Sequence, residues 1–290
     1  MPDIARPTRI PSLVAFDLDD TTLDHGEKDM HPRVQTALER VHALGAATAV
    51  VSGRPVQMLR PIQAHSWVDW LITMNGSLVM RASDEKPLYG KPISRDDVVR
   101  SFAAIDDLGP GLGVIMRTGM AQEQKLVNYM LQGSGPQGMG EKGAEAELEE
   151  LLADTTYIDS AREFVLATDE DIYKIQMSFP DVPARDEAYA RLDALDRYEL
   201  ADMGVVEIEV TARGVNKGTA LDQLCVLAGI DQACSVAFGD SGNDLQMAGH
   251  VGTLVAMGNA TPEFKAVADE ICPPITEQGV ARWLEETCLS

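Results

Sequence analysis

Four short motifs place acidic, hydroxyl and basic side chains directly after apolar runs or at the start of a helical pattern. They are DLDDTTL (17–23), VVSGRP (50–55), NKG (216–218) and GDSGND (239–244). Because ligands bind at the carboxyl ends of strands in open parallel sheets, these motifs are candidates for one site. Together they offer what phosphoryl transfer needs: a nucleophile, an acid for the leaving oxygen, ligands for a divalent cation and donors to phosphate oxygens.

The first motif brings two carboxylates into one turn after the apolar run 12–16. Asp17 is suited to attack phosphorus, and Asp19 to protonate the leaving alkoxide and later activate water. Two acids so close are not both readily ionised without a cation, so we expect a bound metal or a raised pKa. An Asp-rich turn by itself is usually a solvated loop; the three other motifs favour a site.

The last motif adds Asp240, Asn243 and Asp244, whose hard oxygen atoms suit Mg²⁺. Ser52 and Lys217 are candidates to donate to phosphate oxygens. Lys217 stands where a helix is predicted to begin, and its charge there opposes the helix dipole, which favours a ligand-binding role. Purely structural roles remain open for three of these residues. Ser52 can simply end a strand, and Asn243 and Asp244 can cap a short helix.

The composition restricts the partners. The chain of 290 residues has 46 acidic and 24 basic side chains, a formal net charge of −22. Such an excess repels nucleic acids and anionic membranes, and it disfavours an anionic small substrate unless a cation reverses the local field. No apolar run is long enough for a membrane helix, and 1–11 lacks a signal-peptide pattern, so a cytoplasmic location is expected. The cysteines show no metal-binding spacing, and reduced core thiols are expected for Cys225, Cys234, Cys272 and Cys288.

The elements that position these motifs follow a strand–helix–strand pattern. Apolar runs at 12–16, 46–51, 70–74, 235–238 and 253–257 predict strands, and helical spacing predicts helices over 31–44 and 216–227. Nearly unbroken apolar strands favour a doubly wound parallel α/β sheet. We expect this core to comprise 1–84 and 211–290.

Residues 85–210 are predicted to form an inserted α+β domain. A capping-box pattern at 94–97 opens a helix that runs to 108, and a strand is expected over 205–210. Apolar residues alternate with Lys174, Gln176 and Ser178, which predicts a strand with one solvent-exposed face. The segment 132–143 is expected to form a loop, and 141–150 a solvated acidic helix face. Arg162 and Lys174 are expected to form salt bridges rather than to bind an anionic substrate.

The motifs resemble those of haloacid dehalogenase-like superfamily phosphatases, and their layout is similar to the Cof-type, subclass IIB branch. Asp17, Asp19 and Thr21 match the first family motif, DxDx[TV]; Ser52 and Lys217 match the second and third, and 239–244 the acidic fourth. The resemblance implies a Rossmann-like core with a type IIB cap, and an aspartyl-phosphate on Asp17. It also implies Mg²⁺ held by the Asp17 carboxylate, the Asp19 main-chain carbonyl and the Asp240 carboxylate.

The resemblance extends to further positions. Asn243 matches a position that contacts phosphate or substrate. Asp244 matches a position that holds the metal ligands in place without binding the metal itself. Gly53, beside Ser52, is grouped with the phosphate-binding residues, and Asn75 and Gly76 match a segment near the substrate. Asp20 stands where glycine is commonest in the family, and Thr22 where an apolar residue is usual.

The leading hypothesis is a phosphatase for small phosphomonoesters, such as sugar phosphates or related organophosphates, with the insertion as a lid. A phosphotransferase or phosphomutase is the first alternative. Haloacid dehalogenation is disfavoured because it has no use for a second acid at Asp19. A non-catalytic phospho-receiver is a distant alternative, because receivers are shorter and carry their acids on different strands. The sequence does not indicate the oligomeric state.

Overall fold

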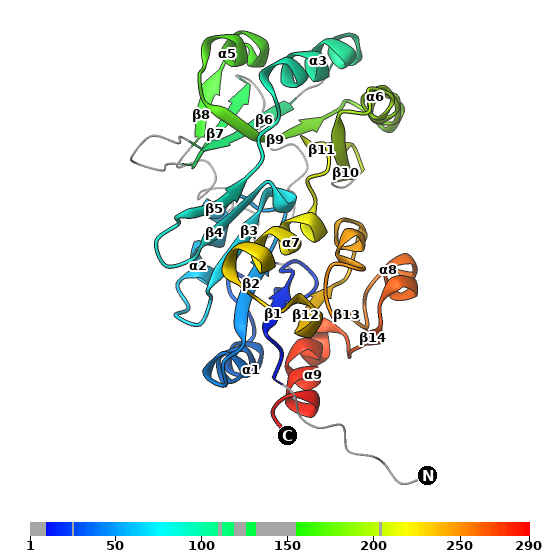
Figure 1. The fold of residues 1–290 in the computed structure, drawn as a ribbon. Helices are drawn as coiled ribbons and strands as arrows, with labels where there is room; N and C mark the ends of the chain where they lie inside the picture. The colour runs from blue at the N-terminus through cyan, green and yellow to red at the C-terminus, as the bar shows by residue number, and fades with distance from the viewer. Residues whose placement is uncertain (1–9, 25, 110–111, 119–125, 132–154, 203–204) are drawn as a thin grey trace.

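The structure is a computed structural model that describes residues 10–24, 26–109, 112–118, 126–131, 155–202 and 205–290. The predicted loop 132–143 and acidic helix face 141–150 lie outside the described residues. The described chain forms two sheets, with the insertion lying above the larger sheet in Figure 1.

The larger sheet has eight strands in the order β14-β13-β12-β1-β2-β3-β4-β5. They are β1 (Leu13–Phe16), β2 (Ala47–Val51), β3 (Trp70–Thr73), β4 (Leu78–Arg81), β5 (Pro87–Gly90), β12 (Ser235–Gly239), β13 (Thr253–Ala256) and β14 (Glu270–Ile271). The strands from β14 to β3 are parallel, and β4 and β5 are antiparallel additions. Both neighbours of β1 are parallel to it and all its residues are buried, which explains its unbroken apolar sequence.

Helices pack around this sheet: α1 (Pro32–Ala43), α2 (Arg60–Gln63), α7 (Lys217–Ala228), α8 (Pro262–Val267) and α9 (Gly279–Thr287). Of the apolar residues that recur at helical spacing over 31–44, Val34, Ala37, Leu38 and Val41 are buried, whereas Leu44 at the end of the helix is 57% exposed. Helix α1 packs against α9, and α7 lies against strands β3, β4 and β5 (Figure 1). The predicted doubly wound α/β fold is confirmed.

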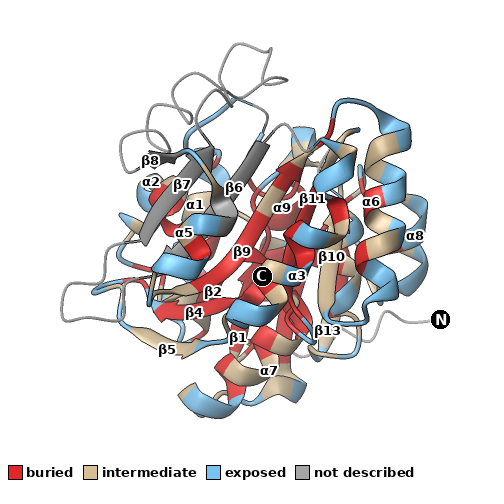
Figure 2. Ribbon diagram, turned by 90° about the horizontal axis from the view of Figure 1, so that it is seen from above, coloured by how far each residue is buried: buried red, intermediate tan, exposed pale blue. Residues whose placement is uncertain are grey.

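The insertion contains a second sheet, in the order β10-β11-β9-β6-β7-β8. Its strands are β6 (Leu112–Thr118), β7 (Leu126–Leu131), β8 (Thr155–Ile158), β9 (Asp171–Ser178), β10 (Tyr198–Asp202) and β11 (Glu207–Ala212), and its helices are α3 (Arg95–Ile105), α5 (Ala161–Ala167) and α6 (Val182–Ala194). All neighbouring pairs are antiparallel except β7 and β8. Figure 2 shows buried residues along β9, whereas α3 and α6 carry exposed outer faces.

The two sheets meet at two linkers. Strand β5 pairs with β4 in the larger sheet, and β11 pairs with β9 in the smaller one, so the chain changes sheet after Gly90 and after Ala212. The predicted division at 84/85 and 210/211 stays a prediction. The strand expected over 205–210 lies two residues later, because its pairing with β9 begins at Glu207.

The predicted solvent-exposed face of β9 is wrong at Lys174, which is 1% exposed. This end of the strand docks on the larger domain rather than facing water. The Lys174 Nζ donates to the carbonyl of Gly53 (2.7 Å), and the Ser77 hydroxyl donates to the carbonyl of Tyr173 (2.9 Å). The expected salt bridge of Lys174 is present, with Glu209 as its partner, whereas the side chain of Arg162 lies outside the described residues.

Candidate active site

Sheet register places the carboxyl ends of four strands side by side. Phe16 at the end of β1 pairs with Phe238 on β12 and with Val50 on β2, and the Asp17 amide donates to the Phe238 carbonyl (3.0 Å). Asp17 and Asp240 therefore leave the sheet at the same edge, although they come from opposite ends of the chain. Ser52 follows β2 at this edge, and its amide donates to the carbonyl of Ile72 on β3 (2.9 Å).

Lys217 lies between two of the acids. Its Nζ is 2.7 Å from Asp17 Oδ1 and 2.6 Å from Asp244 Oδ1, and the lysine is 1% exposed. Burial alone lowers the pKa of Lys217, but attraction by Asp17 and Asp244 outweighs it and the net pKa is raised. The amine is therefore charged. Asn216 caps α7 by accepting from the Thr219 amide (2.9 Å), which fixes where the helix begins and hence where Lys217 lies.

The acids form one cluster with a deficit of positive charge. Asp17, Asp240 and Asp244 offer carboxylate oxygens that all lie within 4.8 Å of one another. Burial raises the pKa of Asp17 well above its ordinary value; Lys217 partly offsets this, and Asp244 and Asp19 add repulsion. Burial, with repulsion from Asp244 and Asp20, raises the pKa of Asp240 to about 7. A cation at this cluster favours the ionised forms.

The three acids are not equivalent as ligands. Asp244 accepts from Lys217 at one oxygen and from the amides of Asp240 (3.0 Å) and Ser241 (3.3 Å) at the other. Asp240 Oδ1 accepts only from the Thr21 hydroxyl among the bonds described for its side chain (3.3 Å). The donor set fits a hard divalent cation, which Asp17 and Asp240 could hold, whereas both oxygens of Asp244 already accept from Lys217 and the loop amides.

The turn after β1 accounts for two family departures. Asp20 has a φ of 58°, in the left-handed region that glycine adopts most easily and that aspartate tolerates. The amides of Thr21, Thr22 and Leu23 all donate to the Leu18 carbonyl. The buried Thr22 hydroxyl donates to the carbonyl of Asp17 (2.7 Å), so this polar residue is satisfied where an apolar one is usual.

Asp19 points to an arginine rather than into the acidic cluster. Its side chain is 52% exposed and accepts from Arg54 Nε (3.0 Å) and Nη2 (2.5 Å). The amide of Arg54 also donates to the buried Ser52 hydroxyl (3.1 Å). Sequence patterns did not predict this pairing, although Arg54 lies only two residues after the candidate Ser52.

The turn after β3 completes the edge. Met74 and Asn75 have φ values of 52° and 57°, and Gly76 has a φ of 98°. A Cβ on Gly76 would lie 2.3 Å from the Asn216 carbonyl oxygen, so only glycine lets this turn approach the start of α7. Asn243 Nδ2 donates to Asn75 Oδ1 (3.4 Å), which links the turn to the acidic loop after β12.

The model of a family described as haloacid dehalogenase-like hydrolase matches residues 14–284. The chain belongs to this family.

Relatives of this haloacid dehalogenase-like hydrolase match along nearly its whole length. YkrA of Bacillus subtilis, which bears a provisional phosphatase name, is 25% identical over 94% of this chain and 96% of its own. YitU of the same organism, named 5-amino-6-(5-phospho-D-ribitylamino)uracil phosphatase, is 25% identical over 95% and 97%. The solved structure of the subclass IIB sugar phosphatase BT4131 covers 94% of this chain and 98% of its own, with a TM-score of 0.76 and 24% identity.

The prediction of an enzyme of the haloacid dehalogenase-like superfamily, with the subclass IIB fold, is thus confirmed. The hydrolase brings Asp17, Ser52, Lys217, Asp240 and Asp244 to one sheet edge, with Gly53, Asn75, Gly76 and Asn243 around it. Their roles stay predictions. Among the described residues, no helix combines the length and apolar character needed to cross a membrane.

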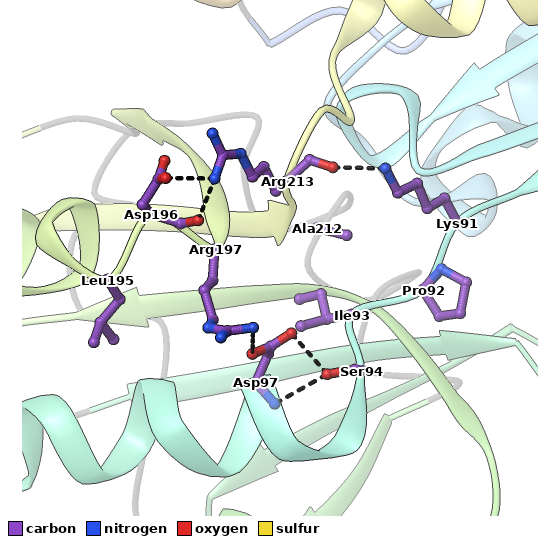
Figure 3. A pocket seen from close by; sticks show the side chains of 10 residues that line it. All are labelled: Lys91, Pro92, Ile93, Ser94, Asp97, Leu195, Asp196, Arg197, Ala212 and Arg213. Atoms are coloured by element: carbon purple, nitrogen blue, oxygen red, sulfur yellow. Dashed lines mark hydrogen bonds and ion pairs between the residues drawn. The ribbon is translucent and has the colours of Figure 1, made fainter.

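Two cavities of this hydrolase differ in their relation to the site. A cavity of ≈ 20 Å³ is lined by Asn75, Lys217 and Asn243 together with 199–201 of β10 in the insertion. The larger cavity, ≈ 540 Å³, lies at the two linkers, and no predicted site residue lines it (Figure 3). Its cations already have partners: Lys91 donates to the Arg213 carbonyl, Arg213 pairs with Asp196, and Arg197 with Asp97. The smaller cavity, although minor in volume, adjoins the chemistry.

Proposed function

We propose that this hydrolase is a Mg²⁺-dependent phosphatase for small phosphomonoesters. The observation that carries the proposal is the buried Lys217 between Asp17 and Asp244, with Asp240 in the same cluster of oxygens. This arrangement combines a carboxylate nucleophile, a fixed cationic donor and a ligand pair for a second cation.

The first half-reaction is assigned to Asp17. One oxygen of its carboxylate is held by Lys217, and the other attacks phosphorus while the bond from phosphorus to the leaving oxygen breaks. Asp19 gives its proton to that oxygen, so the alcohol leaves neutral and the phosphoryl group stays on Asp17. In the second half-reaction Asp19 takes a proton from water, the water oxygen bonds to phosphorus, and Asp17 is released with inorganic phosphate.

The surrounding residues hold the phosphoryl group and its counter-charge. The Asp17 and Asp240 carboxylates and the Asp19 main-chain carbonyl would hold Mg²⁺, which supplies positive charge against the phosphate oxygens. Ser52 and Lys217 donate to the same oxygens. A pre-organised donor of this kind is worth roughly 3–4 kcal/mol of transition-state stabilisation. This local positive charge is required because the chain as a whole has a net charge of −22.

The proposed substrates are phosphorylated metabolites such as sugar phosphates and related organophosphates. Two named relatives support this class, the sugar phosphatase and the phosphatase for a phosphoribitylamino uracil. The insertion places β10 beside Asn75 and Lys217, where it can contact the leaving group. We therefore assign it the role of a cap that excludes water and selects the substrate.

Turnover of a generic aryl phosphate, followed by phosphate release, tests the proposal. The wild-type protein is expected to need Mg²⁺ and to stop on addition of EDTA. Asp17→Asn is expected to fold and bind Mg²⁺ weakly but not to turn over, whereas Asp84→Asn, at an exposed acid in a surface turn, serves as the control. Full turnover by Asp17→Asn, or in EDTA, would contradict the proposal. Transfer of the phosphoryl group to an added sugar in preference to water would indicate a phosphotransferase instead.

A further inference from the structure

A buried ion pair of the cap lies against the strand ends of the larger domain. Lys174 on β9 and Glu209 on β11 form a salt bridge, and each residue is 1% exposed. Buried charges are unfavourable unless they are paired and hydrogen-bonded. The position of this pair therefore needs an explanation beyond the stability of the cap, whose apolar core lies among residues such as Ile175, Met177 and Val210.

Each member of the pair also bonds to the larger domain. Lys174 Nζ donates to the carbonyl of Gly53 (2.7 Å), the residue that follows Ser52. Glu209 Oε2 accepts from Asn75 Nδ2 (2.6 Å), in the turn that follows β3. The pair thus holds both segments of the larger domain that flank the proposed phosphate site.

A bulge in β9 directs the strand toward this junction. Met116 of β6 pairs with Lys174, but the next residue, Arg117, pairs with Ile172, so Tyr173 is an extra residue. Tyr173 packs in the apolar core of the larger domain, whereas Ile172 and Ile175 pack in that of the cap. The bulge thereby lets one strand anchor in both domains, with Lys174 at the point of contact.

The cap determines which way the Asn75 amide faces. An ionised carboxylate only accepts hydrogen bonds, so the NH₂ of Asn75 must face Glu209. The Asn75 Oδ1 then faces the other way, accepts from Asn243 Nδ2 (3.4 Å) and lies where a Cβ on Gly53 would come within 2.9 Å of it. Without Glu209, the Asn75 side chain keeps, among the bonds described for it, only the long one from Asn243 (3.4 Å). The positive φ values of Met74 and Asn75 show a turn that its surroundings must hold in place.

We propose that Lys174 and Glu209 are positioning residues, which fix the Gly53 carbonyl and the Asn75 amide only when the cap is docked. They thereby couple cap docking to the geometry of the segments that receive the phosphate. The inference rests on the proposed phosphatase function and deepens it. By linkage, phosphate binding and docking of this part of the cap favour one another.

A pair of double variants separates positioning from simple stabilisation. Replacing both charges removes the cost of leaving either one unpaired, so both K174M/E209M and K174M/E209Q are expected to fold. They differ in one respect: the glutamine of the second variant still offers Asn75 an acceptor, and the methionine of the first does not. Because Lys91 makes a hydrogen bond between the linkers, away from the site, Lys91→Met is the matched control for a lost junction contact.

The measurements are the thermal midpoint and kcat and KM for an aryl phosphate. We expect both double variants to keep a near-wild-type midpoint, and K174M/E209M to lose about 10²-fold in kcat/KM, a typical effect of misplacing reacting groups. K174M/E209Q is expected to lose clearly less, and Lys91→Met nothing. Wild-type kcat/KM in both double variants, or an equal loss in both, would overturn the proposal.

Hydrogen exchange of the wild-type protein tests the same coupling without a variant and without turnover. Inorganic phosphate with Mg²⁺ is expected to slow hydrogen exchange of the backbone amides of β9 and β11 around Lys174 and Glu209, and of the backbone amide of Asn75. Unchanged exchange at saturating phosphate would refute the coupling. A wild-type protein that binds phosphate and shows the slowing, but turns over no phosphomonoester, would refute the proposed function and leave the coupling intact.

Discussion

The charge balance at Lys217 gives the sharpest test of the site. In Lys217→Met the apolar side chain fills similar space, but the buried carboxylates of Asp17 and Asp244 lose the ammonium that lies 2.7 and 2.6 Å from them. Removing one partner of a buried ion pair costs about 3–5 kcal/mol, since the remaining charge is uncompensated. At roughly 2–4 °C per kcal/mol, the thermal midpoint in EDTA falls by roughly 6–20 °C.

Thermal unfolding in EDTA and in Mg²⁺ measures this effect. Mg²⁺ is expected to raise the midpoint of Lys217→Met more than that of the wild type, because the bound cation supplies the missing charge and no longer meets a neighbouring ammonium. Asp17→Asn/Lys217→Met is expected to recover part of the loss, because one of the two uncompensated carboxylates is gone. Lys86→Met, at an exposed lysine, is the control. A midpoint for Lys217→Met within about 2 °C of the wild type in EDTA would refute the reasoning, because the predicted loss is several kcal/mol.

Three further predictions concern the surrounding structure. Gly76→Ala is expected to destabilise the protein by about 1–3 kcal/mol from backbone strain alone, and by more because its Cβ would meet the Asn216 carbonyl. Gly45→Ala has a similar φ but open space around it, so it measures the strain by itself. An equal loss of unfolding free energy in the two variants would show that the contact with Asn216 has no effect. Arg54→Met is expected to slow turnover most with poor leaving groups, because Asp19, the proposed acid for the leaving oxygen, is no longer held in position. Arg33→Met removes a similar two-bond pair with Glu285, and its rates are expected to stay unchanged. A loss of rate that is independent of the leaving group would contradict this role of Arg54. Burial raises the pKa of Cys272 to about 12 and of Cys225 and Cys288 to about 11, so their thiolate fractions stay small at pH 8. Peptide mapping after brief alkylation should find label first on the partly exposed Cys234, and rapid labelling of Cys272 would be inconsistent with its burial.

The sequence by itself determined the main strands and helices of the larger sheet and which side chains follow them at one edge. Apolar runs mark buried parallel strands, and caps such as Asn216 mark helix starts; both are local signals that survive in one dimension. Because parallel strands end at one edge, the motifs after β1, β2 and β12 had to converge once the fold class was known. That is why Asp17, Ser52 and Asp240 can be grouped from the sequence alone.

Only the tertiary structure decided which charged side chains face one another. The sequence could not distinguish Lys174 from a lysine on a solvated face, since alternation along β9 gives the face but not what covers it. The pairings of Arg54 with Asp19 and of Glu209 with Lys174 and Asn75 join segments remote along the chain. The Arg54–Asp19 pair lies within the larger domain and the Lys174–Glu209 pair within the cap, whereas the Asn75–Glu209 bond depends on how the cap docks. None of these contacts follows from a local sequence pattern. The sequence therefore specified the chemistry available, and the packing of two domains specified which groups are held in place to perform it.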